Sequence, residues 1–306
     1  MQTTALPASS SVPNAADEAR GMLLGLAGVA IFSLTLPCTR LAVRDFDPLF
    51  VTLARALGAA VLAAAWLGWR RSRLPGRAAL PALALVALGC VLGFPLLTSL
   101  AMRTLPAAHG AVLVGVLPLA TALYAALRGF ERPSNGFWGW SLLGAGLVLA
   151  FALQQGGGSV QPADWLMLAA VGAAAAGYAE GARLARTLGG METISWALVL
   201  AALPAAVLLV ACDADGLAHL GTASASAWLA LGYMAVFSMY VGFYFWYRGL
   251  ALGGTARVGQ VQLLQPFLSL GGAAVLLGEP LAPANCGFAL AVIAVVALGR
   301  RMGVRR

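Results

Sequence analysis

The sequence contains no lysine, and charged residues of all kinds make up only 10% of its 306 residues. Soluble domains carry about 25% charged residues. Without lysine there is no P-loop lysine, Schiff base or serine–lysine dyad. The two histidines, His109 and His219, are far apart, and no H-E-x-x-H zinc motif is present. The sequence therefore indicates a protein that is not an enzyme and that has no metal site and no cofactor.

Cysteine is also scarce. The chain has four, Cys38, Cys90, Cys212 and Cys286, which lie in or beside different apolar segments without a C-x-x-C pair. Disulfide frameworks and zinc sites depend on characteristic cysteine spacings. We therefore expect buried free thiols.

Apolar residues dominate the chain instead: 61% of the residues are hydrophobic and the mean hydropathy is +0.87. Windows of about 20 apolar residues, the length that crosses roughly 30 Å of hydrocarbon, occur ten times along the sequence. The sequence predicts an all-α integral membrane protein embedded in a lipid bilayer. The predicted spans are residues 21–40, 48–69, 79–100, 106–127, 136–153, 164–185, 193–211, 227–248, 256–277 and 284–300.

All 19 basic residues are arginines, and their distribution predicts the orientation. With the N-terminus inside, fifteen fall on the cytoplasmic side, whereas Arg40, Arg44 and Arg103 fall outside and Arg55 lies within span two. This asymmetry follows the positive-inside rule. We expect both termini in the cytoplasm and the protein in a bacterial-type inner membrane. The formal charge of +8 then suits anionic headgroups and gives no reason to expect nucleic acid.

Two landmarks recur at an offset of 148 residues, because Pro118 and Glu131 are echoed by Pro266 and Glu279. The chain thus reads as a duplication with five spans in each half. An odd number makes the second copy enter the membrane from the opposite side, and such inverted repeats form a central site near the bilayer midplane in transporters. The predicted organisation is a disordered cytoplasmic tail (1–20), a first five-helix repeat (21–153), a connecting loop (154–163), a second five-helix repeat (164–300) and a basic cytoplasmic tail (301–306).

These features resemble the EamA family of the drug/metabolite transporter superfamily. The resemblance rests on the five-plus-five spans, the proline and following glutamate of spans four and nine, residues 253–258 (Gly-Gly-Thr-Ala-Arg-Val) and Arg55. It implies a secondary transporter that exports small metabolites, and exporters of amino acids, aromatic ones included, are similar. One departure is His109, which stands where the second half has Arg257. A drug or lipophilic-cation exporter and a membrane scaffold without transport activity stay open as alternatives.

Polar and aromatic residues within the spans are the candidate substrate contacts. Tyr240 and Tyr244 belong to a set of five aromatic rings at helical spacing in span eight, and both are too deep for an interfacial belt. Gln262 and Gln265 share a face of span nine, where amides either recognise a zwitterionic solute or tie helices together. The predicted substrate-binding residues are Ser33, Thr98, Tyr178, Tyr240, Tyr244, Gln262 and Gln265. For Ser33 and Thr98 the alternative is back-bonding to a carbonyl near a proline.

The repeated prolines and glutamates also have two interpretations each. Pro118 and Pro266 should bend spans four and nine, either as hinges or as static kinks. Glu131 and Glu279 are expected to cap the start of the next helix, with proton carriage as the alternative.

The remaining ionisable residues in the spans are candidates for coupling or for structural pairing. Glu180 and Arg183 are three residues apart and could form an ion pair on one face. His109 could titrate near neutral pH or be a hydrogen-bonded interfacial histidine. Arg55 must snorkel, pair or face water. No acidic residue stands alone at a midplane position, so the sequence does not indicate proton coupling.

Overall fold

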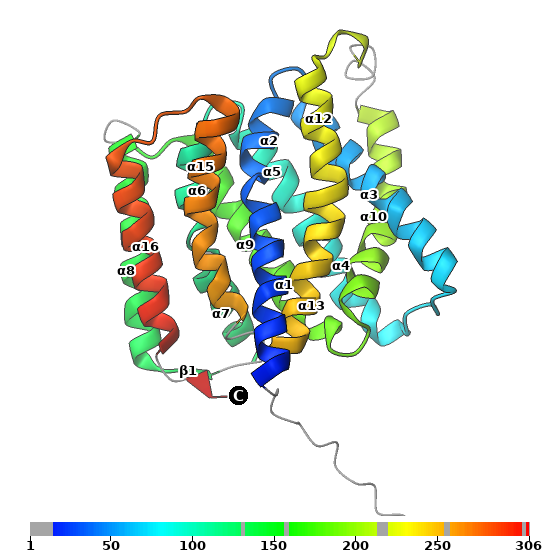
Figure 1. The fold of residues 1–306 in the computed structure, drawn as a ribbon, viewed down its shortest axis with the longest axis horizontal. Helices are drawn as coiled ribbons and strands as arrows, with labels where there is room; N and C mark the ends of the chain where they lie inside the picture. Colours follow the sequence, from blue (N-terminus) through cyan, green and yellow to red (C-terminus); the bar gives the residue numbers. More distant parts are fainter. Residues whose placement is uncertain are drawn as a thin grey trace, which may run out of the picture.

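A computed structural model of the chain describes residues 15–129, 132–155, 159–212, 220–253, 258–301 and 304–305. Its helices run side by side as one bundle (Figure 1). The first helix begins at Ala15, inside the stretch that the sequence assigned to the N-terminal tail. The connection between the two halves is short, because helices already occupy both ends of the predicted loop 154–163.

The helices of the first half are α1 (Ala15–Ser33), α2 (Thr35–Ala42), α3 (Pro48–Arg70), η1 (Arg77–Ala79), α4 (Leu80–Val86), η2 (Ala87–Gly93), α5 (Phe94–Ala101), α6 (Ala107–Val114), α7 (Leu117–Leu127) and α8 (Asn135–Gln155). Those of the second half are α9 (Pro162–Ala185), α10 (Gly190–Cys212), η3 (Leu220–Thr222), α12 (Ala225–Tyr233), η4 (Met234–Val241), α13 (Gly242–Gly253), η5 (Gly259–Leu264), α15 (Gln265–Leu277) and α16 (Pro283–Arg301). A two-residue antiparallel ladder joins β1 (Arg132–Pro133) to β2 (Val304–Arg305).

Six helical stretches among the described residues are long and apolar enough to cross a membrane: Ala19–Ala42, Pro48–Trp69, Arg77–Ala101, Ala107–Leu127, Gly190–Ala211 and Ala225–Gly253. Three shorter apolar helices cover Trp138–Gln154, Val261–Leu277 and Pro283–Val295. The predicted span six corresponds to α9, which is not among the six. Its sequence includes Asp164, Glu180 and Arg183, and charged side chains reduce the mean hydropathy of a helix.

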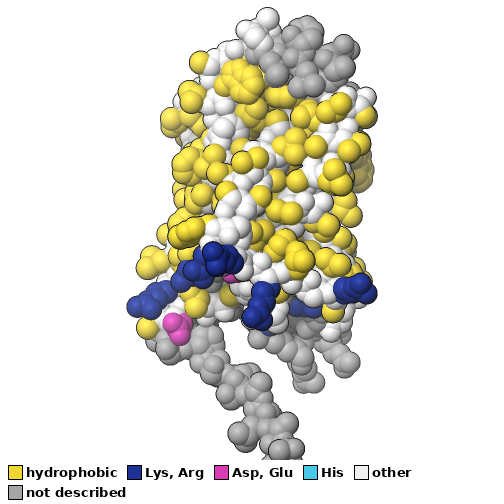
Figure 2. All heavy atoms as spheres, turned by 90° about the vertical axis from the view of Figure 1, so that its right-hand side faces the viewer, with side chains coloured by type: hydrophobic (Ala, Val, Ile, Leu, Met, Phe, Trp, Pro, Cys, Tyr) yellow, Lys and Arg dark blue, Asp and Glu magenta, His cyan; other side chains and the backbone are white. Residues whose placement is uncertain are grey.

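The outer surface of the bundle is apolar over most of its height. Figure 2 shows hydrophobic side chains covering one face, with arginine side chains gathered toward the lower end. Leu203 and Val275 are 74% and 84% exposed. Large exposed apolar surfaces of this kind suit contact with lipid.

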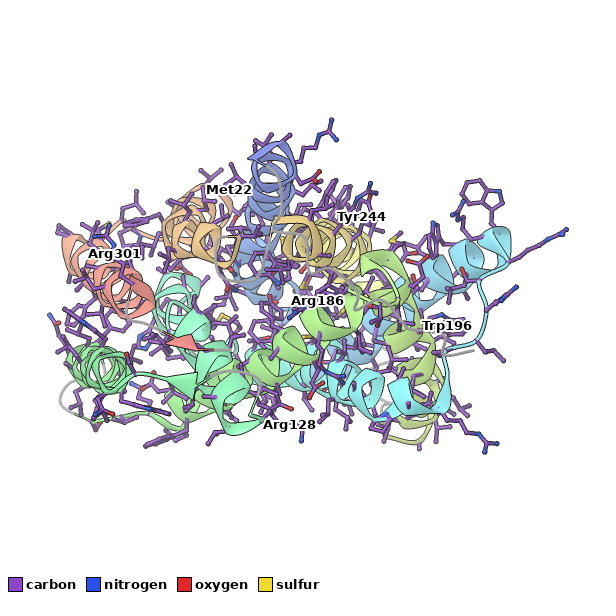
Figure 3. All side chains as sticks on the ribbon, turned by 90° about the horizontal axis from the view of Figure 1, so that it is seen from below. Met22, Arg128, Arg186, Trp196, Tyr244 and Arg301 are labelled. Carbon is purple, nitrogen blue, oxygen red and sulfur yellow. The ribbon has the colours of Figure 1, made fainter. Side chains whose placement is uncertain are left out.

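Helices from different halves make the most extensive contacts. α1 packs along α13, α3 along α10, α8 along α16, and α6 against α15, while α9 packs against α5 and η2. Viewed from below, the bundle has an elongated cross-section, with Arg301 of α16 near one end and Trp196 of α10 toward the other (Figure 3). The two halves therefore interlock along the whole bundle.

Capping side chains fix where several helices begin. Asp47 accepts a hydrogen bond from the Leu49 N–H at 2.8 Å, directly before Pro48 opens α3. Ser224 accepts from Ala227 N at the start of α12. Both residues satisfy backbone N–H groups that have no partner within their helix.

Both predicted bends are present as interruptions of a helix. Pro118 lies in the first turn of α7, after α6 ends at Val114, and Pro266 lies in the first turn of α15, after the 3₁₀ turns of η5. A Cβ atom placed on Gly115 would lie 3.3 Å from Cγ of Pro266. The two interruptions therefore pack against each other, one from each half.

Two further interruptions are π-helical. η2 begins at Ala87 and η4 at Met234, so they occupy corresponding places in the two halves. π-Helical turns occur frequently at functional sites.

The expected buried free thiols are found at two positions. Cys38 and Cys90 are free and buried, whereas Cys286 is free but only partly buried, which corrects the prediction for that residue. The side chain of Cys212 lies outside the described residues.

Candidate functional site

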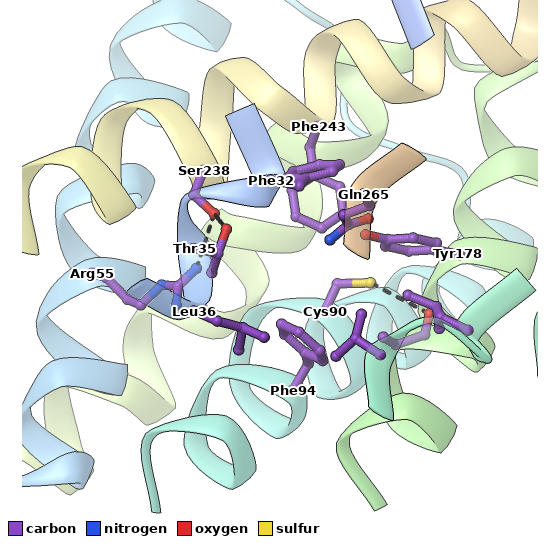
Figure 4. A pocket seen from close by; sticks show the side chains of 13 residues that line it. Phe32, Thr35, Leu36, Arg55, Cys90, Phe94, Tyr178, Ser238, Phe243 and Gln265 are labelled. Carbon is purple, nitrogen blue, oxygen red and sulfur yellow. Dashed lines mark hydrogen bonds between the residues drawn. The ribbon is translucent and has the colours of Figure 1, made fainter. Parts of the chain in front are cut away.

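A narrow cavity lies inside the bundle between helices of both halves (Figure 4). The space open to water within it is about 20 Å³, little more than the roughly 10–15 Å³ that one water molecule requires. The walls leave no room for an organic solute in this conformation. Among the described residues no group of three or more His, Cys, Asp or Glu side chains could hold a metal ion.

Corresponding positions of the two halves meet in this cavity. Leu117 and Gln265, which are 148 residues apart, both line it. Cys90 and Ser238 are separated by the same offset and come from the two π-helical segments η2 and η4. Residues at matching positions of the two halves thus line one cavity, and the more polar member of each pair belongs to the second half.

Three aromatic rings form one end of the cavity. The ring of Phe32 lies 5.0 Å from that of Phe243 and 6.4 Å from that of Tyr178, and the rings of Tyr178 and Phe243 are 5.9 Å apart between centroids. Trp246 packs behind them at 5.7 Å from Tyr178. Edge-to-face and offset contacts at these distances stabilise an aromatic cluster. This end of the cavity can take an apolar or aromatic group.

A buried arginine forms the other end. Arg55 is 2% exposed, and its Nη atoms reach only Ser238 Oγ at 3.4 Å and Met234 Sδ at 3.7 Å. Its Nε has no hydrogen-bond partner, and no carboxylate among the described residues lies within ion-pair distance of it. Thr35 and Ser238 share a hydrogen bond of 2.7 Å beside it. Arg55 is therefore a buried cation with weak partners.

The two glutamines predicted to contact substrate, Gln262 of η5 and Gln265 of α15, are both buried. Gln265 lines the cavity, and its Oε1 has no hydrogen-bond partner. Gln262, three residues earlier on the 3₁₀ segment, has an unpartnered Nε2 but does not line the cavity. Residues three apart eclipse in a 3₁₀ helix, which accounts for the shared face.

Two of the predicted substrate contacts use their hydroxyl groups within their own helix. Ser33 donates to the carbonyl of Ala30 at 2.6 Å, and Thr98 donates to the carbonyl of Phe94 at 2.7 Å. Neither residue lines the cavity. The back-bonding alternative therefore describes both residues.

Tyr240 and Tyr244 also lie away from the cavity. The Tyr240 hydroxyl pairs with Ser195 Oγ at 3.2 Å. Tyr244 accepts a hydrogen bond from Arg248 at 2.6 Å and lines a separate pocket of about 520 Å³ near the C-terminal ends of α3 and α13. The π-helical turn of η4 explains the difference, because its wider turn changes the regular helical spacing on which the shared aromatic face was predicted. Phe237 of that set is 47% exposed on the outside.

A polar cluster joins the halves on the predicted cytoplasmic side of the cavity. Glu180 pairs with Arg183 at 3.0 Å, and its other oxygen pairs with Arg128 at 3.2 Å and accepts from Tyr124 at 3.3 Å. Glu180 itself is fully buried, whereas both arginine side chains are about half exposed. The ion pair with Arg183 is thus one part of a contact that also holds α7 of the first half.

A second polar cluster joins the halves on the opposite side. His109 Nε2 lies 2.8 Å from Asp164 Oδ1, and both side chains are buried. Glu279 accepts from the N–H groups of Ala107 and Ala108 at 2.9 and 2.8 Å. Glu279 therefore caps α6 of the first half. The sequence had suggested a different role, the capping of the next helix in its own half. The corresponding prediction for Glu131, like the comparison of His109 with Arg257, lies outside the described residues.

The EamA-like transporter family matches residues 19–153 and 161–300. The chain belongs to this family. It is 50% identical over 281 residues to "Uncharacterized transporter YdeK" of Bacillus subtilis (strain 168). The aligned region covers 92% of this chain and 97% of that protein. A solved crystal structure with 18% identity has a TM-score of 0.63 and covers 93% of this chain and 98% of its own, so the two share a fold. Together with the apolar helices, these findings make the protein a multi-pass membrane transporter.

In this EamA-like transporter, sequence reasoning missed several cavity residues. Thr35, Ser238 and Phe243 line the cavity, but single polar or aromatic residues in an apolar span carry no periodic signal. Asp164 does leave a signal in the sequence, because an acidic residue three positions after Gln161 at the start of a helix indicates a capping box. The pairing of Asp164 with His109 could be identified only from the folded structure.

Proposed function

We propose that this EamA-like transporter is a secondary transporter that exports small metabolites, amino acids and among them aromatic ones, by alternating access across a bacterial-type inner membrane. The cavity between the two halves, lined by matching positions of both, is the observation that carries the proposal. Aromatic rings and an unpartnered amide in one cavity suit a solute with an apolar side chain and polar backbone groups.

Ten spans in two inverted sets of five are part of the proposal. The packing pattern supports it, because a two-fold axis in the membrane plane would map the α3–α10 and α8–α16 contacts onto themselves and the α6–α15 contact onto the contact between η5 and α7. The same axis would exchange the α1–α13 contact with the α9–α5 contact, and both are extensive. The two consecutive family matches also fit a duplication.

The two polar clusters are the proposed gates. Arg128 with Glu180 joins the halves on one side of the cavity, and Ala108 with Glu279 joins them on the other. In alternating access one of these contacts breaks while the other holds. The bends at Pro118 and Pro266, which meet near Gly115, are the proposed hinges.

The distribution of arginine supports the proposed orientation, with both termini in the cytoplasm and the Glu180 cluster at the inner end. The direction of transport is taken from the resemblance to exporters. Facilitated diffusion or exchange suits the cavity better than proton coupling, since no carboxylate lies among the described residues that line it.

Transport into proteoliposomes that hold the purified protein tests this function. Radiolabelled phenylalanine, leucine, glutamate and arginine, together with a lipophilic cation such as tetraphenylphosphonium, would be offered with and without a pH gradient. We expect saturable flux of phenylalanine that needs no gradient. Flux of the lipophilic cation alone would favour the drug-exporter alternative. Flux of no solute above empty liposomes, with the protein shown to be folded, would favour the scaffold.

A further inference from the structure

The proposed gates and hinges give no role to Arg55, the cation in the middle of the bundle. A buried guanidinium is expensive unless it is paired and hydrogen-bonded. Here the side chain is 2% exposed, its Nε has no partner among the described residues, and the oxygen to which its Nη2 donates, Ser238 Oγ, lies at the long distance of 3.4 Å. Five donors in a planar fork match a carboxylate better than any group now beside them.

Three of the four aromatic side chains that line the cavity lie apart from its arginine, and the fourth, Phe94, lies beside Leu36. In Figure 4, Arg55, Thr35 and Ser238 lie at one end, Phe32, Phe243 and Tyr178 cluster toward the other, and Gln265 lies close to the aromatic rings. A solute with a charged head and an apolar body would contact both ends at once. The Oε1 of Gln265 would accept from an N–H of such a solute.

We propose that Arg55 binds the carboxylate of the transported solute, and that the substrates are amphipathic carboxylates with an aromatic or branched apolar group. This inference rests on the proposed function and names its substrate class. An amine on the solute is accommodated by Gln265 but is not the recognised group. Cations without a carboxylate are excluded, because they would lie beside an uncompensated positive charge in a cavity of low dielectric.

The contracted cavity agrees with this role. The about 20 Å³ of open space fits only about one water molecule, so the solute enters when the halves separate. The contacts of Arg55 to Ser238 and Met234, at 3.4 and 3.7 Å, are weak enough for a carboxylate to replace them.

Binding to the purified protein in detergent tests the inference without flux. Isothermal titration calorimetry would compare three ligands of one shape: L-phenylalanine, 3-phenylpropionate, which lacks the amine, and phenethylamine, which lacks the carboxylate. We expect the first two to bind and phenethylamine not to bind. A detergent assay is preferable because a weak acid such as phenylpropionate crosses lipid unaided.

Variants of Arg55 then test the residue itself. Arg55→Gln should weaken both carboxylates by roughly ten- to a hundredfold, the loss of a charge-assisted hydrogen bond. Arg55→Lys should weaken them less, because the charge remains but the planar fork is lost. The matched control is Arg103→Gln, whose side chain is 55% exposed and pairs with Asp47, and which should bind as the wild type does.

Equal binding of phenethylamine and phenylpropionate, binding of none of the three ligands to the folded wild type, or unchanged affinity in Arg55→Gln would each overturn the inference. If Arg55→Gln does not fold, the ligand series and Arg55→Lys still decide. Saturable amino-acid flux that is unaltered in Arg55→Gln would leave the proposed function standing without this inference. Arg55-dependent binding of the carboxylates without any flux would support this inference and contradict the proposed function.

Discussion

The carboxylate of Glu279 accepts a hydrogen bond of 2.8 Å from the backbone N–H of Ala108. The donor belongs to the first turn of α6 in the first half, whereas the carboxylate follows α15 in the second. The first N–H groups of a helix have no partner within it, and the helix dipole favours an anion there. One side chain therefore satisfies the start of a helix and ties the halves together.

Removal of this cap should destabilise the fold and loosen that end of the bundle. Glu279→Ala is expected to lower the free energy of unfolding by about 1 kcal/mol, and Glu279→Gln by less, because its amide keeps one acceptor oxygen. Thermal unfolding in detergent measures the first effect. Labelling of Cys90 with a membrane-impermeant maleimide, in a chain whose other cysteines are replaced by serine, measures the second. Equal stability of all three proteins would contradict the capping role.

A side chain at Gly115 should obstruct the contact between the two bends. Its Cβ would lie 3.1 Å from Cγ1 of Val292 and 3.3 Å from Cγ of Pro266. We expect Gly115→Val to cost about 1–3 kcal/mol through overpacking and to slow transport in proteoliposomes more than this loss of stability explains.

Gly146 on α8 provides the matched control, because nothing lies within 4 Å of a Cβ placed there. Gly146→Val should leave stability and transport nearly unchanged. Full transport by Gly115→Val would show that the two bends are static features of the packing.

The two arginines that pair with Glu180 should differ in their effect on the inner gate. Arg128 comes from α7 of the first half, whereas Arg183 lies on the same helix as Glu180. Arg128→Gln should therefore increase cytoplasmic labelling of Cys90, and Arg183→Gln should change it little. Both arginines are about half exposed, so each substitution should cost less than about 1 kcal/mol of stability. Identical labelling of the two variants would argue against a gate between the halves.

Acid should weaken a contact between the two halves at the end opposite the Glu180 cluster. The hydroxyl and the backbone N–H of Ser224 donate to the carboxylate of Asp45, and this lowers the pKa of Asp45 below its ordinary value. The unfolded chain, with its pKa of about 3.9, then binds more protons than the folded chain between the two pKa values. The stabilisation is thus present above about pH 5 and is lost as the pH falls through the folded pKa.

Unfolding temperatures of the wild type and of Asp45→Asn, compared from pH 6 down to pH 3.5, check this prediction. The wild type should lose more stability over that range, since the variant has no carboxyl to protonate at this position. Parallel curves for the two proteins would contradict it.

The bends of spans four and nine could be predicted from the sequence because proline acts locally. Pro118 and Pro266 cannot donate the hydrogen bond that a continuous helix needs, whatever surrounds them. The apolar spans were predictable for a similar reason, since hydropathy sums over a single segment. Among the described helices of spanning length, the exception is α9, whose charged residues Asp164 and Glu180 lower its mean hydropathy and are buried in contacts with the other half.

The cavity could be predicted only in part, since its residues are selected by packing between segments far apart in the chain. Of the predicted substrate contacts, Tyr178 and Gln265 line it, whereas Tyr240 and Tyr244 do not, because the π-helical turn of η4 alters a spacing that the sequence pattern assumes to be regular. Arg55 was visible as a cation within a span. That no carboxylate among the described residues pairs with it could be seen only in the folded chain.

The walls of the cavity are matched in position but not in chemistry, and this makes the proposed transport cycle asymmetric. The second half contributes Ser238 and Gln265 where the first contributes Cys90 and Leu117. In the proposed alternating-access cycle the inward-facing and outward-facing states are therefore not related by symmetry, and we expect a solute to half-saturate the carrier at different concentrations on the two sides. In a facilitative carrier detailed balance still applies. Such sidedness alters how fast the protein works in each direction, while the concentration gradient alone decides where the solute accumulates.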